Sequence, residues 1–191
     1  MSNKKHNNMN QIIMPPIIFS GKNLVGKEVE HCTRTLGDIR SIFEQGHLIT
    51  AAQADSVAYS ISSYLPEKEG TPGGLYFGVT CLHSGLVGDE YLMTKGHFHA
   101  NMDTAEFYWG IEGEGVLILM DEQGNVGGER MFPGSLHYIP GRMAHRVANV
   151  SDITLTFGAC WPSNAGHNYE LAGQGGFTAR LKKINEIPQF V

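Results

Sequence analysis

The sequence predicts an all-β protein folded as one small barrel or sandwich. From residue 75 onward, short stretches rich in β-branched and aromatic residues alternate with glycine-containing turns, which is typical of such folds. Asp121-Glu-Gln-Gly-Asn125 lies between two strand-like stretches and predicts a β-hairpin. The chain has 191 residues, which fits one domain with a substantial buried core.

Residues 1–30 are expected to form an irregular or short-stranded N-terminal arm ahead of a single domain at 31–191. The apolar stretch Ile12–Phe19 follows Lys4 and Lys5 but contains two prolines and precedes no small-residue cleavage site, so it does not fit a signal peptide. We expect it to be extended and to pack on the barrel or on a second subunit. No stretch reaches the ~20 apolar residues of a membrane helix.

Thr35 to Gly46 is the best helix candidate. Leu36, Ile39 and Phe43 would share one helix face, as in an amphipathic helix packed on a core. Thr35 can cap the first turn and Gly46 can end the helix.

The remaining elements are predicted to be strands. In the stretch from Glu106 to Ile111, alternation places Glu106 and Tyr108 on one face and Phe107 and Trp109 on the other. A last strand is expected within Phe177 to Val191. The predicted strands before it are Leu75 to Cys81, Glu106 to Ile111, Val116 to Met120, Leu136 to Ile139 and Ile153 to Cys160.

Four side chains indicate a metal site. His97 and His99 flank Phe98, and in an extended chain the two imidazoles point the same way. Glu106 begins the next strand, and His145 follows a turn-rich segment that starts at Pro140. Three imidazoles and one carboxylate suit Mn, Fe, Co, Ni or Zn better than Ca or Mg.

The placing of these residues resembles the two motifs of the cupin superfamily. That resemblance implies a single-domain cupin, a double-stranded β-helix or jelly-roll barrel, with all four ligands inside it. The first motif comprises Gly96, His97, His99, Glu106 and Gly113, and the second comprises Gly134, Pro140, His145 and Asn149.

Within the cupins, the chain resembles the metal-dependent glucose-6-phosphate isomerases of archaea and some bacteria. It departs from them at Trp161, where a tyrosine is common, and at Gly141-Arg-Met143. The matching segments are Leu36-Gly-Asp-Ile-Arg40, Thr94-Lys-Gly-His-Phe-His-Ala-Asn-Met-Asp-Thr-Ala-Glu106, Pro133-Gly-Ser-Leu-His-Tyr-Ile-Pro140, Ala144-His-Arg-Val-Ala-Asn149 and Trp161-Pro-Ser-Asn-Ala-Gly-His-Asn-Tyr169.

The resemblance implies interconversion of glucose 6-phosphate and fructose 6-phosphate by a cytoplasmic homodimer of glycolysis and gluconeogenesis. It implies one divalent ion per subunit, Fe²⁺ first and Mn²⁺, Ni²⁺ or Zn²⁺ as alternatives. The predicted metal ligands are His97, His99, Glu106 and His145, the predicted catalytic residues are Glu106, His145 and Tyr108, and the predicted substrate and phosphate positions are Thr80, Thr94, Gly96, Tyr108, His167 and Tyr169.

The reaction moves a hydrogen between C1 and C2, and two routes stay open. Glu106 can carry the proton through a cis-enediol, or the hydrogen can move as a metal-assisted hydride shift. Thr80, Thr94 and the Gly96 backbone supply phosphate donors. Lys95 adds charge nearby, although alternation favours a solvated position for it.

Composition gives no case for a nucleic-acid or membrane partner. The formal net charge is −5 and the pI is about 6.0, so no basic surface is indicated. Three cysteines without a metal or redox spacing predict reduced thiols in the cytosol. Two other functions compete with isomerisation: a different cupin metalloenzyme, such as an Fe-dependent dioxygenase or another sugar isomerase or epimerase, and a non-catalytic sugar-binding cupin.

Overall fold

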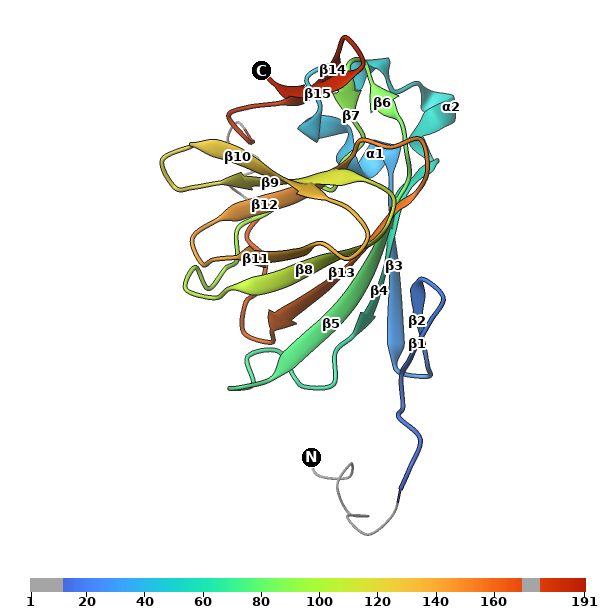
Figure 1. Ribbon diagram of the computed structural model, residues 1–191, viewed down its shortest axis with the longest axis vertical. Coiled ribbons are helices and arrows are strands. Elements are labelled where there is room, and N and C mark those ends of the chain that lie inside the picture. Colours follow the sequence, from blue (N-terminus) through green and yellow to red (C-terminus); the bar gives the residue numbers. More distant parts are fainter. Residues whose placement is uncertain (1–11, 170–175) are drawn as a thin grey trace.

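The computed structural model describes residues 12–169 and 176–191, and strands dominate this part of the chain (Figure 1). The all-β prediction is therefore confirmed. The strands run as β1 (Ile18–Ser20), β2 (Asn23–Val25), β3 (Val29–Thr35), β4 (Val57–Tyr64), β5 (Leu75–Leu82), β6 (Leu86–Val87), β7 (Glu90–Tyr91), β8 (Glu106–Glu112), β9 (Gly115–Met120), β10 (Val126–Met131), β11 (Leu136–Ile139), β12 (Ala144–Asn149), β13 (Leu155–Pro162), β14 (Leu181–Ile184) and β15 (Ile187–Phe190).

The largest sheet has six antiparallel strands in the order β11-β8-β13-β5-β4-β3. A second sheet, in the order β10-β9-β12, lies across from it (Figure 1). Strands β15-β14-β7-β6 form a third sheet, which gathers with the short helices at the top of Figure 1. Strands distant in the sequence are therefore neighbours, as expected for the jelly-roll arrangement.

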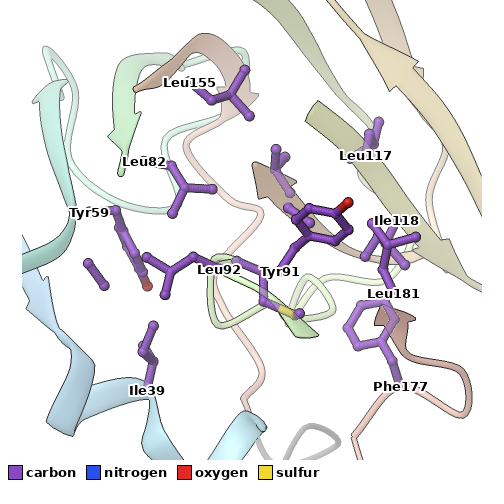
Figure 2. Close-up of a cluster of buried hydrophobic side chains, with 14 of the residues drawn as sticks. Ile39, Tyr59, Leu82, Tyr91, Leu92, Leu117, Ile118, Leu155, Phe177 and Leu181 are labelled. Atoms are coloured by element: carbon purple, nitrogen blue, oxygen red, sulfur yellow. The ribbon is translucent and has the colours of Figure 1, made fainter. Parts of the chain in front are cut away.

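The main core lies between these sheets. Both Leu117 and Ile118 on β9 are fully buried, so this strand is covered on both of its faces. Figure 2 shows Ile118 on the same side of the cluster as Phe177 and Leu181, with Tyr59 on the opposite side. All six residues of β12 are buried, and this strand carries His145 into the core.

The hairpin and five predicted strands are confirmed. Asp121 closes the β9–β10 turn, because its backbone N–H donates to Asn125 O at 3.1 Å and its carboxylate accepts from Gln123 and Asn125. Strands β5, β8, β9, β11 and β13 occupy the five predicted stretches. The C-terminal segment contributes β14 and β15, two strands where one was expected.

The helix prediction from Thr35 to Gly46 is wrong beyond its first turns. Helix α1 (Leu36–Ile39) is followed by the 3₁₀ turn η1 (Arg40–Ile42), while Gly46 begins a second 3₁₀ turn, η2 (Gly46–Leu48), instead of ending the helix; α2 (Ala51–Ala54) comes next. The Thr35 cap is confirmed, since its hydroxyl accepts from Asp38 N at 3.2 Å. Phe43 is extended.

A tertiary contact explains where the helical turns stop. The backbone N–H of Glu44 donates to the buried carboxylate of Glu90 at 2.6 Å, and an N–H committed there cannot continue a helical ladder. The turn also lets both Ile39 and Phe43 enter the core. None of the helices in the described ranges has the length and apolar content needed to cross a membrane.

The first described residues of the N-terminal arm are exposed. Residues 1–11 of the predicted arm lie outside the described part, and the division at residue 30 stays a prediction; β3 begins at Val29. The β1–β2 hairpin buries Leu24, whereas Ile12, Ile13 and Met14 are exposed and lead away from the sheets (Figure 1). These three side chains do not pack on the barrel.

Candidate metal centre and cavity

The two sheets bring His97, His99, Glu106 and His145 together, with one ligand atom of each within 4.8 Å of the others. His97 and His145 pair through their backbones, with N–H to O distances of 3.2 and 3.0 Å. Phe98 is buried on the side opposite the histidine pair, and the rings of His97 and His99 lie 5.7 Å apart. The predicted alternation is therefore observed, and no other segment of the described chain offers such a group.

Glu106 lies at the middle of the group. Its Oε1 is 2.5 Å from His145 Nε2 and 3.3 Å from His99 Nε2. Both Glu106 Oε1 and His145 Nε2 are buried, and neither has a hydrogen-bond partner of acceptable geometry in the described chain. Buried polar atoms without partners are costly, and two of them pointing at one another fit a position that a cation fills.

The hydrogen bonds behind the rings fix which nitrogens face the centre. His99 Nδ1 lies 3.0 Å from Thr104 O, and His145 Nδ1 lies 3.2 Å from Met143 O. A carbonyl oxygen can only accept, so each Nδ1 carries the proton and each Nε2 keeps its lone pair. Both lone pairs are directed toward Glu106, the arrangement that a metal-binding imidazole requires.

Charge and burial favour the metal-binding protonation states of two of the four side chains, His97 and Glu106. Burial, with help from the neighbouring imidazoles, lowers the pKa of His97 to about 2. For Glu106, burial raises the pKa, but His145 and His99 outweigh it and bring the pKa to about 2. At neutral pH His97 is therefore neutral and Glu106 ionised, the forms that bind metals. Three imidazole nitrogens and one carboxylate oxygen fit a divalent first-row transition ion.

The centre opens into a cavity of about 270 Å³. All the sequence-predicted site residues line it, and their roles stay predictions. They are His97, His99, Glu106 and His145 at the metal centre, and Thr80, Thr94, Gly96, Tyr108, His167 and Tyr169 around it.

Aromatic and polar side chains are ordered around the centre. Burial, together with the nearby Glu106 carboxylate, raises the pKa of Tyr108 well above its usual range. His167 stacks on Tyr169 with ring centroids 5.7 Å apart and lies 4.5 Å from the His97 ring. Burial raises the pKa of Tyr59, which also lines the cavity, to about 12.

The position of Lys95 differs from the one expected from the sequence. Alternation favours a solvated position, but Lys95 lines the cavity, and its Nζ lies 4.7 Å from the Tyr169 ring centroid. Gly96, the next residue, has φ +76°. Residues 94–96 lie outside the strands of the structure, so strand alternation does not determine the direction of the Lys95 side chain.

Sequence reasoning missed part of the lining. Most of the missed residues lie on strands β4, β5 and β13, and alternation from Thr80 could have found Gly78 on β5. His137 is absent from the lining; it bonds Ser135 and Glu129. The missed lining residues are Cys32, Ile61, Ser63, Leu65, Gly78, Phe157 and Ala159.

Comparisons with known proteins agree with this geometry. The sequence model of a family described as glucose-6-phosphate isomerase matches residues 33–188. The chain is 36% identical over 154 residues to a glucose-6-phosphate isomerase of Thermococcus litoralis, covering 80% of each chain. It is 37% identical to the Pyrococcus furiosus protein of the same name, covering 76% of this chain and 77% of that one.

More distant proteins match less of the chain. A putative glucose-6-phosphate isomerase 2 of Rhizobium meliloti is 34% identical, over 67% of this chain and 63% of that protein. The solved structure of oxalate decarboxylase from Bacillus subtilis overlaps 58% of this chain and 27% of that one, at a TM-score of 0.46 and 18% identity. That likeness is too low to establish a shared fold.

Proposed function

Because this chain belongs to the glucose-6-phosphate isomerase family, we propose that it interconverts glucose 6-phosphate and fructose 6-phosphate at the centre formed by His97, His99, Glu106 and His145. One observation carries this proposal: three imidazoles and a carboxylate converge on one wall of a cavity of about 270 Å³. That volume lies a little below the ~300–1,000 Å³ typical of small-molecule sites.

The same four side chains would hold the divalent ion. Fe²⁺ is our first choice, with Mn²⁺, Ni²⁺ or Zn²⁺ as alternatives, because each accepts mixed imidazole and carboxylate ligands. When bound, the ion polarises the substrate carbonyl and stabilises negative charge developing on its oxygen.

Glu106 is the proposed base. It would take the proton from C2 of glucose 6-phosphate, so that the electron pair forms the C1–C2 double bond of a cis-enediol, and return the proton to C1; the O2 hydroxyl proton moves to O1, and C2 becomes the carbonyl. Tyr108 lies on the same face of β8 as this carboxylate and lines the same cavity, and His145 Nε2 lies 2.5 Å from its Oε1. Both neighbours would hold the carboxylate at one orientation beside the reacting carbons, which is their proposed catalytic contribution.

The alternative route is a direct hydride shift from C2 to C1, in which Glu106 accepts no proton. The two routes differ in exchange with solvent. Turnover of fructose 6-phosphate in deuterated water places deuterium at C2 of the product only when a base carries the hydrogen as a proton. Product free of deuterium after repeated turnover would refute the role of Glu106 as base.

Thr80, Thr94 and Gly96 are proposed to bind the phosphate. Thr94 Oγ1 accepts the Val147 N–H at 3.0 Å, so its own hydrogen stays available to a ligand. Thr80 is 9% exposed and lines the cavity. The Lys95 ammonium adds the positive charge that a phosphate requires, while His167 and Tyr169 contribute donors near His97.

A metal-depletion assay tests the function. We expect isomerisation to disappear after chelator treatment, to return with Fe²⁺ or Mn²⁺, and to be absent in His97→Ala at every metal concentration. His83→Ala, at an exposed position away from the cavity, is the matched control and should keep full activity. Metal binding without isomerisation by any ion would refute the isomerase and favour another cupin reaction or a sugar-binding role.

We also propose a homodimer. Strand β11 is an edge of the six-stranded sheet, and Leu136, Tyr138 and the paired Phe107 expose 68%, 56% and 44% of their surface. Clustered exposed apolar side chains mark interaction surfaces. Light scattering should give a dimer that Tyr138→Glu converts to a monomer, and a monomeric wild type at micromolar concentration would refute this assignment.

We also propose that the protein is cytoplasmic and that it acts in glycolysis and gluconeogenesis. All three cysteines, Cys32, Cys81 and Cys160, are free thiols. Unpaired thiols support a reducing compartment, which is also where glucose 6-phosphate is available.

A further inference from the structure

Gly78 lies in the middle of strand β5, where glycine weakens the strand because it has no side chain to pack. It has no positive φ, so backbone conformation does not require it, and a strand glycine often marks the close approach of another group. A Cβ at this position would lie 3.1 Å from both Cη2 and Cζ3 of Trp161 and 3.5 Å from Ser63 Oγ. A methyl group at Gly78 would therefore crowd the indole of Trp161, which would have to move by a few tenths of an ångström.

The strand register explains this contact. Trp161 on β13 is directly opposite Tyr76 on β5, and Gly78 follows Tyr76 by two residues, so the indole crosses diagonally onto the glycine. The rings of Trp161 and Tyr76 meet edge to face at 5.9 Å. The Tyr76 hydroxyl is tied to Glu67 O at 3.0 Å, which limits movement of the indole away from Gly78.

The same face of the sheet forms one wall of the cavity. Ser63, Gly78 and Ala159 are register neighbours on β4, β5 and β13 and all line the cavity, as does Trp161. These three residues are small, so Trp161 is the bulk of this wall. Cys160 is opposite Phe107, which places Trp161 and Glu106 at the next position of their neighbouring strands.

We propose that Trp161, seated on Gly78, sets the length of phosphosugar that the cavity accepts. This wall lies beside Glu106. The indole would therefore limit the length of a ligand that is bound at the metal centre. The inference rests on the proposed function for the class of ligand, which is an open-chain sugar phosphate. It assigns to two residues a role in choosing among such ligands, with Gly78 as the positioning residue for Trp161.

Equilibrium binding tests the inference without turnover. The probes are aldonic acid phosphates of five, six and seven carbons, which cannot isomerise, titrated calorimetrically into the metal-loaded protein. Gly78→Ala should push the indole into the cavity and weaken binding of the six-carbon ligand about tenfold relative to the five-carbon one, as expected for one methyl group in a close-fitting site. Trp161→Leu should strengthen binding of the seven-carbon ligand relative to binding of the six-carbon ligand.

The double variant supplies the decisive comparison. If the Gly78 methyl acts through the indole, Gly78→Ala should change the length preference less than about twofold in the Trp161→Leu background. Trp161→Phe, which keeps an aromatic ring against Tyr76, serves if Trp161→Leu does not fold, and should show a smaller shift in the same direction.

Three results would overturn the inference: an equal effect of Gly78→Ala in both backgrounds, an unchanged preference in both Trp161 variants, or a wild type that binds none of the probes. Failure of the proposed function is seen separately. A wild type that binds the probes with this length dependence but isomerises no sugar phosphate would refute the isomerase and leave the size limit standing.

Discussion

Thr104→Val should weaken metal binding although Thr104 does not touch the metal position. His99 Nδ1 lies 3.0 Å from Thr104 O and 2.8 Å from Thr104 Oγ1, and that hydroxyl donates to Asn101 O at 2.7 Å. The hydroxyl therefore accepts from the imidazole and fixes its ring plane. Valine keeps the shape of threonine but removes this acceptor.

The size of the effect follows from what remains. The Thr104 carbonyl still accepts from Nδ1, so the tautomer of His99 is retained and only ring orientation is loosened. Losing one such hydrogen bond costs about 1 kcal/mol, and groups behind metal ligands typically contribute about 10- to 100-fold in affinity. We therefore expect a loss near the lower end, about tenfold.

Competition with a chromophoric chelator measures this affinity directly. Thr104→Ser retains the hydroxyl, so its metal affinity should stay within about threefold of that of the wild type. A general folding defect would instead affect both variants and lower the melting temperature of the metal-free protein. A Thr104→Val affinity within twofold of the wild type, under conditions that resolve His97→Ala, would refute the argument.

Three further predictions follow from the same geometry. Adding Mn²⁺ at about 100 times its Kd should stabilise the stripped protein by about 2.7 kcal/mol, seen as a higher melting temperature; an unchanged value would contradict binding to the folded state. The pKa of His97 is about 2 in the folded protein and about 6.5 in the unfolded chain. The unfolded chain therefore binds more protons than the folded protein below pH 6.5. The free energy of unfolding of the metal-free protein should fall by up to about 2 kcal/mol between pH 6.5 and 5. Urea unfolding of His97→Gln should show a shallower dependence, and an identical slope would count against this cause. Gly96→Ala, at φ +76° with a Cβ 2.9 Å from Arg146 Cβ and Phe177 Cε2, should destabilise more than Gly134→Ala, at φ +89° with no atom within 4 Å; equal denaturation midpoints would contradict the crowding.

Alternation predicted the two faces of strand β8 correctly. In β8, Glu106 and Tyr108 face inward and Phe107 is exposed, as alternation predicts. Strand β12 has no such pattern because all six of its residues are buried. It was therefore missed as a strand, even though it carries His145.

The helix failed for a related reason. Leu36, Ile39 and Phe43 have helical spacing, and the Thr35 cap formed as predicted. The helical turns nevertheless stop at Ile42, because Glu90, far along the sequence, takes the backbone N–H of Glu44. A partner on another strand thus outweighs a local preference.

The sequence by itself determined the chemistry of the centre: the ligand types, the shared direction of His97 and His99, and the common face of Glu106 and Tyr108. These depend on side-chain identity and on the twofold repeat of an extended backbone, which are local properties. Only the tertiary structure decided that Glu106 Oε1 lies 2.5 Å from His145 Nε2, that Lys95 turns into the cavity, and that Trp161 rests on Gly78. Those distances depend on strand register and on how two sheets pack, and both are set by contacts between residues far apart in the chain.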